Sequence, residues 1–235
     1  MKTACLIAFL LSFTVCRAAS PPPDYQHKTN EELLVLLNSS SVHTRFNALS
    51  GLQSNLFPLA VTRQASPGAA LVANVTTKTF DLLKNEDDVN IKLVATNLLL
   101  TLNSWTDTVP MIEYGLTAKD HEVQINAIRA LQFIAWDHDR KISTQAMQVL
   151  EVLLKPGSGD MDNIQILYQA AEAAGYMGRE AETREQAKAL IPLLQDLVKY
   201  PTKMTADPEG HTLSEVAAES IQEINAVKKQ ATAAP

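Results

Sequence analysis

The stretch DHEVQINAIRAL, residues 120–131, places a capping residue and three apolar residues at the intervals of one helix face. Asp120 can cap the helix, and Val123, Ala127 and Leu131 follow at steps of three, four and four residues. Such steps put side chains on the same side of an α-helix. The alanine at the centre of that side would let a neighbouring helix approach closely, so the stretch predicts a helix packed against a partner.

The same frame occurs four more times along the chain. Each copy begins with a capping-type residue, which is glycine in the last copy. An apolar or β-branched residue follows, then an alanine, then a leucine, isoleucine or alanine. These copies are SVHTRFNALSGL (41–52), DVNIKLVATNLL (88–99), NIQILYQAAEAA (163–174) and GHTLSEVAAESI (210–221).

The intervals between copies have the length of a helical hairpin. A hairpin with apolar residues on two sides cannot bury its core alone, so successive hairpins are expected to stack. An irregular all-α bundle stays open as the alternative, because amphipathic helices alone do not specify stacking. The intervals are 47, 32, 43 and 47 residues, measured between Ala48, Ala95, Ala127, Ala170 and Ala217.

These frames resemble the HEAT repeat, in which one helix has the pattern Asp-x-x-Val-Arg-x-x-Ala-x-x-x-Leu. The copy at 88–99 matches closely, and the copy at 120–131 matches with Gln124 in place of arginine. The copy at 41–52 begins with Ser41 in place of aspartate and matches at the four later positions, Thr44, Arg45, Ala48 and Leu52. The last two copies depart at the basic position, which holds Leu167 and Ser214.

The resemblance implies a right-handed α-solenoid of about five stacked helical hairpins over residues 29–230. It also implies that the solenoid binds another protein, since that is the usual work of HEAT folds. A fold does not fix a function by itself, so both remain expectations.

The remaining pattern predicts an all-α chain, because no segment sustains the period-two alternation of a strand. Thr29 and Glu32 form a capping-box signature, Ser66 and Pro67 are expected to begin a helix, and residues 20–27 are expected to be a stiff, extended lead-in. Helices are expected over about 41–55, 66–84, 88–104, 108–118, 120–136, 139–155, 161–177, 180–200 and 212–230.

Residues 1–18 are predicted to be a cleavable secretory signal peptide. Lys2 precedes an apolar core that is too short to span a bilayer, and small residues follow it. We therefore expect a secreted or periplasmic protein. Its mature form would have a proline-rich lead-in (19–28), the helical domain (29–230) and a disordered tail (231–235).

Cysteine content and charge exclude several classes of function. Cys5 and Cys16 both lie in the predicted signal peptide, so the mature protein would have no disulfide and no thiol for catalysis or metal binding. The net charge of −6 disfavours a nucleic-acid partner, because neutralising phosphates requires a basic face. No later stretch is apolar enough to predict a transmembrane segment.

His121 and His138 lie beside carboxylates and are candidates for a metal or acid–base site. The pair His121-Glu122 is similar to metal-binding dipeptides of HEAT-like iron hydroxylases, which need several such pairs on facing repeats. The two histidines lie near opposite ends of one predicted helix, about 25 Å apart, so they cannot share a metal within that repeat. We expect no cofactor and interpret both as solvated groups near helix ends.

Four other residues are candidates for surface function. Trp105 and Trp136 end two frame helices and are interpreted either as a binding hot spot or as packing at the edge of the core. Asn38 and Asn74 begin glycosylation-type sequons, which matter only in a eukaryotic secretory pathway.

Three hypotheses of function remain. The repeat pattern favours a non-enzymatic scaffold that binds a partner protein as an adaptor, chaperone, inhibitor or immunity-type protein. A bound metal or a polar cleft with clustered histidines would instead indicate an enzyme on a helical scaffold. A continuous apolar groove would indicate a lipid or glycan binder.

Overall fold

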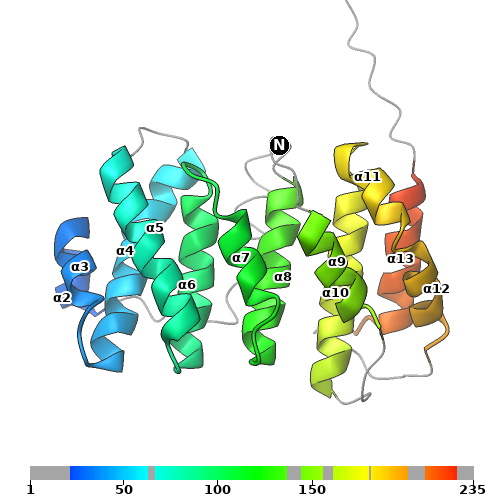
Figure 1. The fold of residues 1–235 in the computed structure, drawn as a ribbon, viewed down its shortest axis with the longest axis horizontal. Helices are drawn as coiled ribbons and strands as arrows, with labels where there is room; N and C mark the ends of the chain where they lie inside the picture. The colour runs from blue at the N-terminus through cyan, green and yellow to red at the C-terminus, as the bar shows by residue number, and fades with distance from the viewer. Residues whose placement is uncertain are drawn as a thin grey trace, which may run out of the picture. The chain divides into compact units, whose positions relative to one another are not determined.

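The computed structural model describes residues 22–62, 67–136, 144–155, 161–179, 181–200 and 210–226. Helices joined by turns account for these residues, and no β-strand occurs among them, so the predicted all-α class is confirmed (Figure 1). The chain divides into two compact units, Met1–Thr108 (unit 1) and Val109–Pro235 (unit 2), and each is described by itself.

Unit 1 is organised around a pair of frame helices. α4 packs against α3 and α6, while α5 packs against α3 and α6 and α2 packs against α4. Two neighbouring repeats therefore share one core. The helices are α2 (Pro23–Gln26), α3 (Asn30–Leu36), α4 (Val42–Thr62), α5 (Ala69–Asn85) and α6 (Val89–Leu102).

Unit 2 is organised around three frame helices, α8, α10 and α13, which lie side by side in that order (Figure 1). Shorter helices pack against this row: α7 on α8, α9 on α10, α11 on α10 and α13, and α12 on α13. The helices are α7 (Val109–Gly115), α8 (His121–Trp136), α9 (Thr144–Leu153), α10 (Met161–Arg179), α11 (Ala181–Lys188), α12 (Ile191–Val198) and α13 (Leu213–Asn225).

The frame alanines lie in the cores of both units. A Cβ atom added to Gly115 of α7 would lie only 2.9 Å from the Cβ atom of Ala127 of α8. The prediction that this alanine permits a close helix approach is therefore confirmed. All five alanines have an exposed fraction of 0%: Ala48, Ala95, Ala127, Ala170 and Ala217.

A second close approach joins α10 to α13. A Cβ atom at Gly178 would lie 2.6 Å from the Cα atom of Ile224, and one at Gly175 would lie 3.0 Å from the Cα atom of Ser220. The two glycines and their two partners are each about one helical turn apart, so the backbones touch along a turn. Larger residues at either glycine would force the helices apart.

Two predicted helix caps are confirmed, and one is corrected. Thr29 and Glu32 form a reciprocal capping box at the start of α3, and Asp88 accepts a hydrogen bond from the Ile91 amide at 3.1 Å. In the last frame the cap is Thr212 rather than Gly210. Thr212 forms its own capping box with the glutamate three residues later, because serine and threonine satisfy free amides that glycine cannot.

Several predicted boundaries were wrong. The lead-in is not extended throughout, since α2 forms over Pro23–Gln26 with proline in its first turn, where its fixed φ suits a helix. α4 continues to Thr62, past the predicted end at residue 55 and through Pro58. α5 begins at Ala69 rather than at residue 66, with Gly68 in the capping position.

The predicted helix over 180–200 is two helices. α11 ends at Lys188, and α12 begins at Ile191 with Pro192 in its first turn. Pro192 has no amide proton to continue the hydrogen bonds of α11, which explains the break. The predicted signal peptide (1–18), the tail (231–235) and His138 lie outside the described residues.

Within the part of the chain that the structure describes, no helix combines the length and the hydropathy that crossing a membrane requires.

Candidate binding face on the frame helices

Polar side chains recur on one side of three frame helices, away from the frame alanine, except at Gly175 of α10. Positions one before, two after and five after the alanine lie about 140–260° around the helix from it. Because they are three residues apart, they are neighbours on the helix surface. We call these three positions the amide face. It consists of Asn47, Ser50 and Gln53 in α4; Asn126, Arg129 and Gln132 in α8; and Gln169, Glu172 and Gly175 in α10.

The amide residue that precedes the alanine is buried in each of these helices. Asn47 is 3% exposed, and Asn126 and Gln169 are each 8% exposed. Burying a carboxamide is unfavourable unless it is hydrogen-bonded. Asn47 meets this requirement within its own helix, because its Nδ2 atom lies 3.0 Å from the Nε2 atom of His43.

In unit 2 the amide faces of α8 and α10 are joined by hydrogen bonds. Arg129 donates its Nε proton to Gln169 Oε1 at 3.0 Å. Gln132, which is 2% exposed, donates from Nε2 to the Gln169 backbone oxygen at 3.2 Å and to Glu172 Oε2 at 3.3 Å. The seam between the two helices is therefore polar on this side.

Polar contacts also join α10 to α13. Arg179 lies with its guanidinium carbon 4.1 Å from the centre of the Tyr176 ring and pairs with both carboxylate oxygens of Glu223. Burial raises the pKa of Tyr176, and the negative charge of Glu172 raises it further. Burial alone would lower the pKa of Arg179, but Glu223 outweighs it, so the net direction is upward. Both ionisable groups keep their neutral-pH charge states.

Three oxygen atoms of the amide face are buried without a hydrogen-bond partner. They are Gln53 Oε1 and Ser50 Oγ in α4 and Gln132 Oε1 in α8. The two glutamines occupy the same position of the frame, five residues after the alanine, in different units. Buried acceptors that lack a donor are uncommon in folded proteins and require an explanation.

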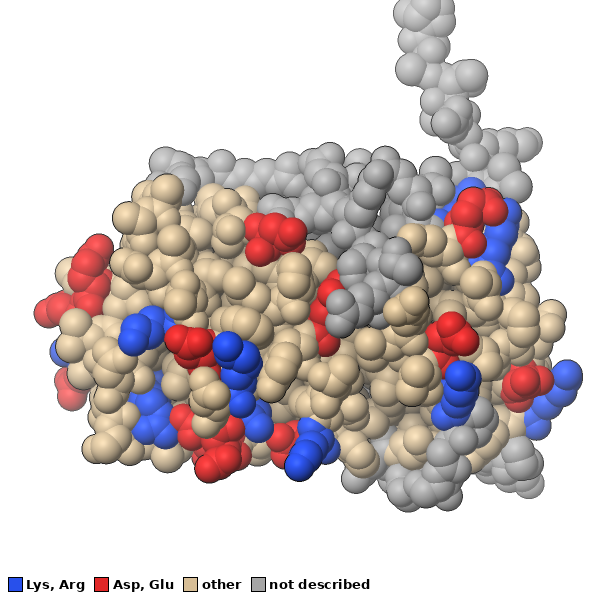
Figure 2. Space-filling model, viewed as in Figure 1, with Lys and Arg blue, Asp and Glu red and all other residues tan. Residues whose placement is uncertain are grey.

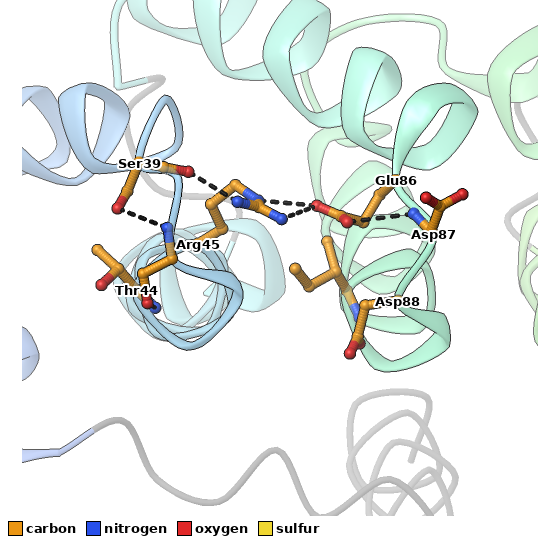
Figure 3. Close-up of polar contacts among 8 residues, drawn as sticks. Ser39, Thr44, Arg45, Glu86, Asp87 and Asp88 are labelled. Atoms are coloured by element: carbon orange, nitrogen blue, oxygen red, sulfur yellow. Dashed lines mark hydrogen bonds and ion pairs between the residues drawn. The ribbon is translucent and has the colours of Figure 1, made fainter.

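Figure 3 shows a second polar cluster, at the start of α4. Arg45 donates from Nε to Glu86 Oε2 at 2.7 Å and from Nη1 to the Ser39 backbone oxygen at 2.7 Å. The side chains of Arg45 and Glu86 are only 14% and 10% exposed. Asp88, two residues after Glu86, is the N-cap of α6. Glu86 at the end of α5 and Asp88 at the start of α6 therefore stabilise the repeat.

The two tryptophans belong to different units, and the side chain of Trp136 lies outside what the structure describes. Trp105 is half-buried in the turn after α6, where its amide donates to the Leu102 oxygen at 2.9 Å. Trp136 is the last residue of α8 and belongs to the other unit. The binding hot spot proposed for them stays a prediction.

His121 is exposed in the first turn of α8, as its sequence position indicates. Among the described residues, no group of three or more histidine, cysteine, aspartate or glutamate side chains is arranged to hold a metal ion.

The two sequon asparagines are both exposed but lie in different backbone settings. Asn38 follows α3 in a turn, and its Oδ1 atom accepts a hydrogen bond from Lys78 Nζ at 2.8 Å. Asn74 lies inside α5, and the Thr76 hydroxyl of its sequon is buried.

The amide face was missed by sequence reasoning, although a signal for it exists. On α10, Gln169, Glu172, Tyr176 and Arg179 follow one another at steps of three, four and three residues, which places them on one helix side. The glutamines at the fifth position after the alanine also recur in the first, third and fifth frames. The hydrogen bonds between helices could not be predicted, because their partners lie 37 to 44 residues apart.

Comparison with known proteins gives no assignment. No protein-family model matches the chain, and no curated protein matches it. A crystal structure of an engineered protein is similar at 22% identity with a TM-score of 0.48, covering 83% of this chain and 78% of the other.

Proposed function

We propose that this chain is an exported, non-enzymatic protein whose helical repeats present an extended surface to a partner protein. The observation that carries the proposal is the row of packed frame helices in each unit, on which Gln53, Arg129 and Glu172 are half-buried polar residues. A surface that repeats with the fold suits an extended partner better than a single small substrate.

The proposal includes a HEAT-like α-solenoid over residues 29–230. In its favour, frame helices pack on frame helices in both units, α4 on α6 in unit 1 and α8 on α10 on α13 in unit 2. Shorter helices cover the same row in unit 2. This is the order that stacked hairpins would produce.

Surface charge favours recognition by shape and hydrogen bonding over recognition of a strongly charged polymer. On the face drawn in Figure 2, the basic side chains of the described residues lie beside acidic ones in each unit. The net charge of −6 would favour the approach of a partner with a basic patch by electrostatic steering.

Export is proposed from the composition of residues 1–18, which carry a basic start, an apolar core and both cysteines. Expression of the full chain followed by intact-mass measurement of the exported protein tests this part. The expected product begins at Ala19 and contains no cysteine. A product that retains residues 1–18 would rule out processing at the proposed site.

The binding function is tested by affinity capture with the chain from residue 19 as bait, followed by reconstitution with each purified candidate. A true partner should raise the melting temperature of the bait, because a ligand that binds only the folded state stabilises it. Candidates that are captured but leave the melting temperature unchanged, at concentrations well above those used for capture, would count against the proposal.

A further inference from the structure

We infer that Asn38, and not Asn74, is the residue that receives an N-linked glycan when the chain enters a eukaryotic secretory pathway. The inference goes beyond the proposed binding of a partner and does not depend on it. It assigns a modification site to unit 1 and gives a physical reason for the position of that site.

The first sequon lies outside the helices. Asn38 and Ser40 belong to the turn between α3 and α4, and both residues are exposed. The sequon is a motif of surface loops, because the transferase must reach the asparagine together with the hydroxyl group two residues later. In the folded protein both groups of this sequon are accessible.

The second sequon lies inside a helix. Asn74 is in the middle of α5, and residues two apart in a helix do not face the same side. Asn74 is exposed, but Thr76 is only 6% exposed and its hydroxyl oxygen is buried. The helix therefore presents the asparagine of this sequon without its hydroxyl group, which is why the two sites differ.

The contacts of Asn38 are compatible with the linkage. Its Oδ1 atom accepts a hydrogen bond from Lys78 Nζ at 2.8 Å, and its Nδ2 atom lies 3.4 Å from the Val35 backbone oxygen. The reaction takes place at Nδ2 and leaves Oδ1 unchanged. A glycosylated amide keeps one of its two N–H groups and its oxygen. The contact with Lys78 can therefore persist and orient the sugar.

The transfer requires a sugar donor, an oligosaccharide carried on a polyprenyl diphosphate. A bond forms between Asn38 Nδ2 and the anomeric carbon of the oligosaccharide. The bond from that carbon to the diphosphate oxygen breaks, and the diphosphate keeps the electron pair. One Nδ2 proton passes to solvent. No oxidant or reductant takes part.

Two exposed apolar side chains lie on either side of the turn. Val35 in α3 is 70% exposed, and Val42 at the start of α4 is 43% exposed. They lie three residues before and four residues after Asn38. Terminal repeats of a stacked array need a polar outer surface to stay soluble, and a glycan is bulky and solubilising. A glycan on Asn38 covers this apolar surface of the first repeat.

The test expresses the full chain in eukaryotic cells, beside a copy in which a well-characterised secretory signal replaces residues 1–18. The copy enters the pathway whatever the natural start does. Chains from cells and medium are treated with peptide N-glycosidase, which converts a glycosylated asparagine to aspartate, and peptide mass spectrometry locates the change. Ser40→Ala removes the first sequon but keeps Asn38 and its contact with Lys78. Asn74→Gln is the matched control.

We expect a glycan on Asn38 alone, which Ser40→Ala abolishes and Asn74→Gln leaves unchanged. Loss of the glycan should lower the fraction of the protein that is monomeric in size-exclusion chromatography. The changes Val35→Thr and Val42→Thr, added to Ser40→Ala, should restore that fraction. This rescue is the result that a glycan without a role at the apolar surface would not give.

A chain in the secretory pathway that lacks a glycan on Asn38, or carries one on Asn74, would overturn the inference. An unchanged monomeric fraction after loss of the glycan would overturn the account of its position. If the full chain is exported and processed but carries no glycan, the inference fails and the proposed export stands. If only the copy enters the pathway and is modified on Asn38 alone, the proposed export fails and the site stands.

Discussion

Gly115 in α7 and Ala127 in α8 lie so close that a single added Cβ atom on the glycine would come within 2.9 Å of the alanine Cβ atom. Real Cβ atoms are not packed at that distance, so the third repeat has no room for one more methyl group at this contact. Four other repeats place an alanine with no exposed surface at the same frame position. Small residues at these positions therefore set the distance between helices.

Replacing Ala127 with leucine should destabilise unit 2 by about 1–3 kcal/mol, because overpacking a tight core forces side chains and backbone to shift. His121→Ala, at the exposed start of the same helix, should change stability by less than about 0.5 kcal/mol. Thermal and urea denaturation of both variants measures the difference. A severe effect of the histidine change would show that this repeat has been misinterpreted.

Gly178→Ala adds only one methyl group but should destabilise unit 2 strongly. Alanine normally stabilises a helix interior relative to glycine by about 1 kcal/mol. Here the added carbon would meet the Cα atom of Ile224 at 2.6 Å, so α13 must move. We expect a net loss of roughly 3 kcal/mol in urea denaturation. Gln222→Ala on the exposed side of α13 is the control, and equal effects of the two changes would refute the close contact.

Replacing one partner of the Arg45–Glu86 ion pair should destabilise the protein more than replacing both partners. Arg45→Met or Glu86→Leu alone leaves a largely buried charge without its partner, which costs about 3–5 kcal/mol. The double variant should recover part of that loss, and a double-mutant cycle measures the coupling. Lys199→Met serves as a control, because Lys199 and Asp196 are 77% and 70% exposed. Additive single effects would show that the pair is not coupled.

The capping box of α3 should make the first repeat sensitive to acid. Hydrogen bonds from the backbone and side chain of Thr29 hold the pKa of Glu32 below its ordinary value of 4.5. The stabilisation is therefore fully present above pH 4.5 and is lost as pH falls through the lower, folded pKa. Amide exchange near Thr29 should speed up in that range, and Glu32→Gln should weaken the dependence. Unchanged exchange down to strongly acidic pH would contradict this role.

The sequence predicted those parts of the fold that depend on local chemistry. The helical class, the buried alanines and the caps at Thr29 and Asp88 follow from side-chain spacing and from which groups can satisfy free amides. The break at Pro192 was also visible in the sequence, because proline cannot continue the hydrogen bonds of a helix, but it was missed. α2 was missed because a run of prolines favours an extended chain as well as a first helical turn.

The candidate site was less predictable, because it depends on which helices become neighbours. The amide recurrence around Ala48, Ala127 and Ala170 can be read from the chain. The contacts of these amide residues cannot be predicted from the chain, because the hydrogen bond from Arg129 to Gln169 joins residues 40 apart in the sequence. Unpartnered oxygens such as Gln132 Oε1 become apparent only when every neighbour is in place.

The central claim is that the frame helices bind a partner protein, and amide hydrogen exchange tests it directly. Exchange is compared between the chain from residue 19 alone and the same chain with a reconstituted partner. Our account predicts slower exchange on binding in more than one frame helix, because a repeat protein presents an extended surface. Protection confined to one segment outside the frame helices would contradict it.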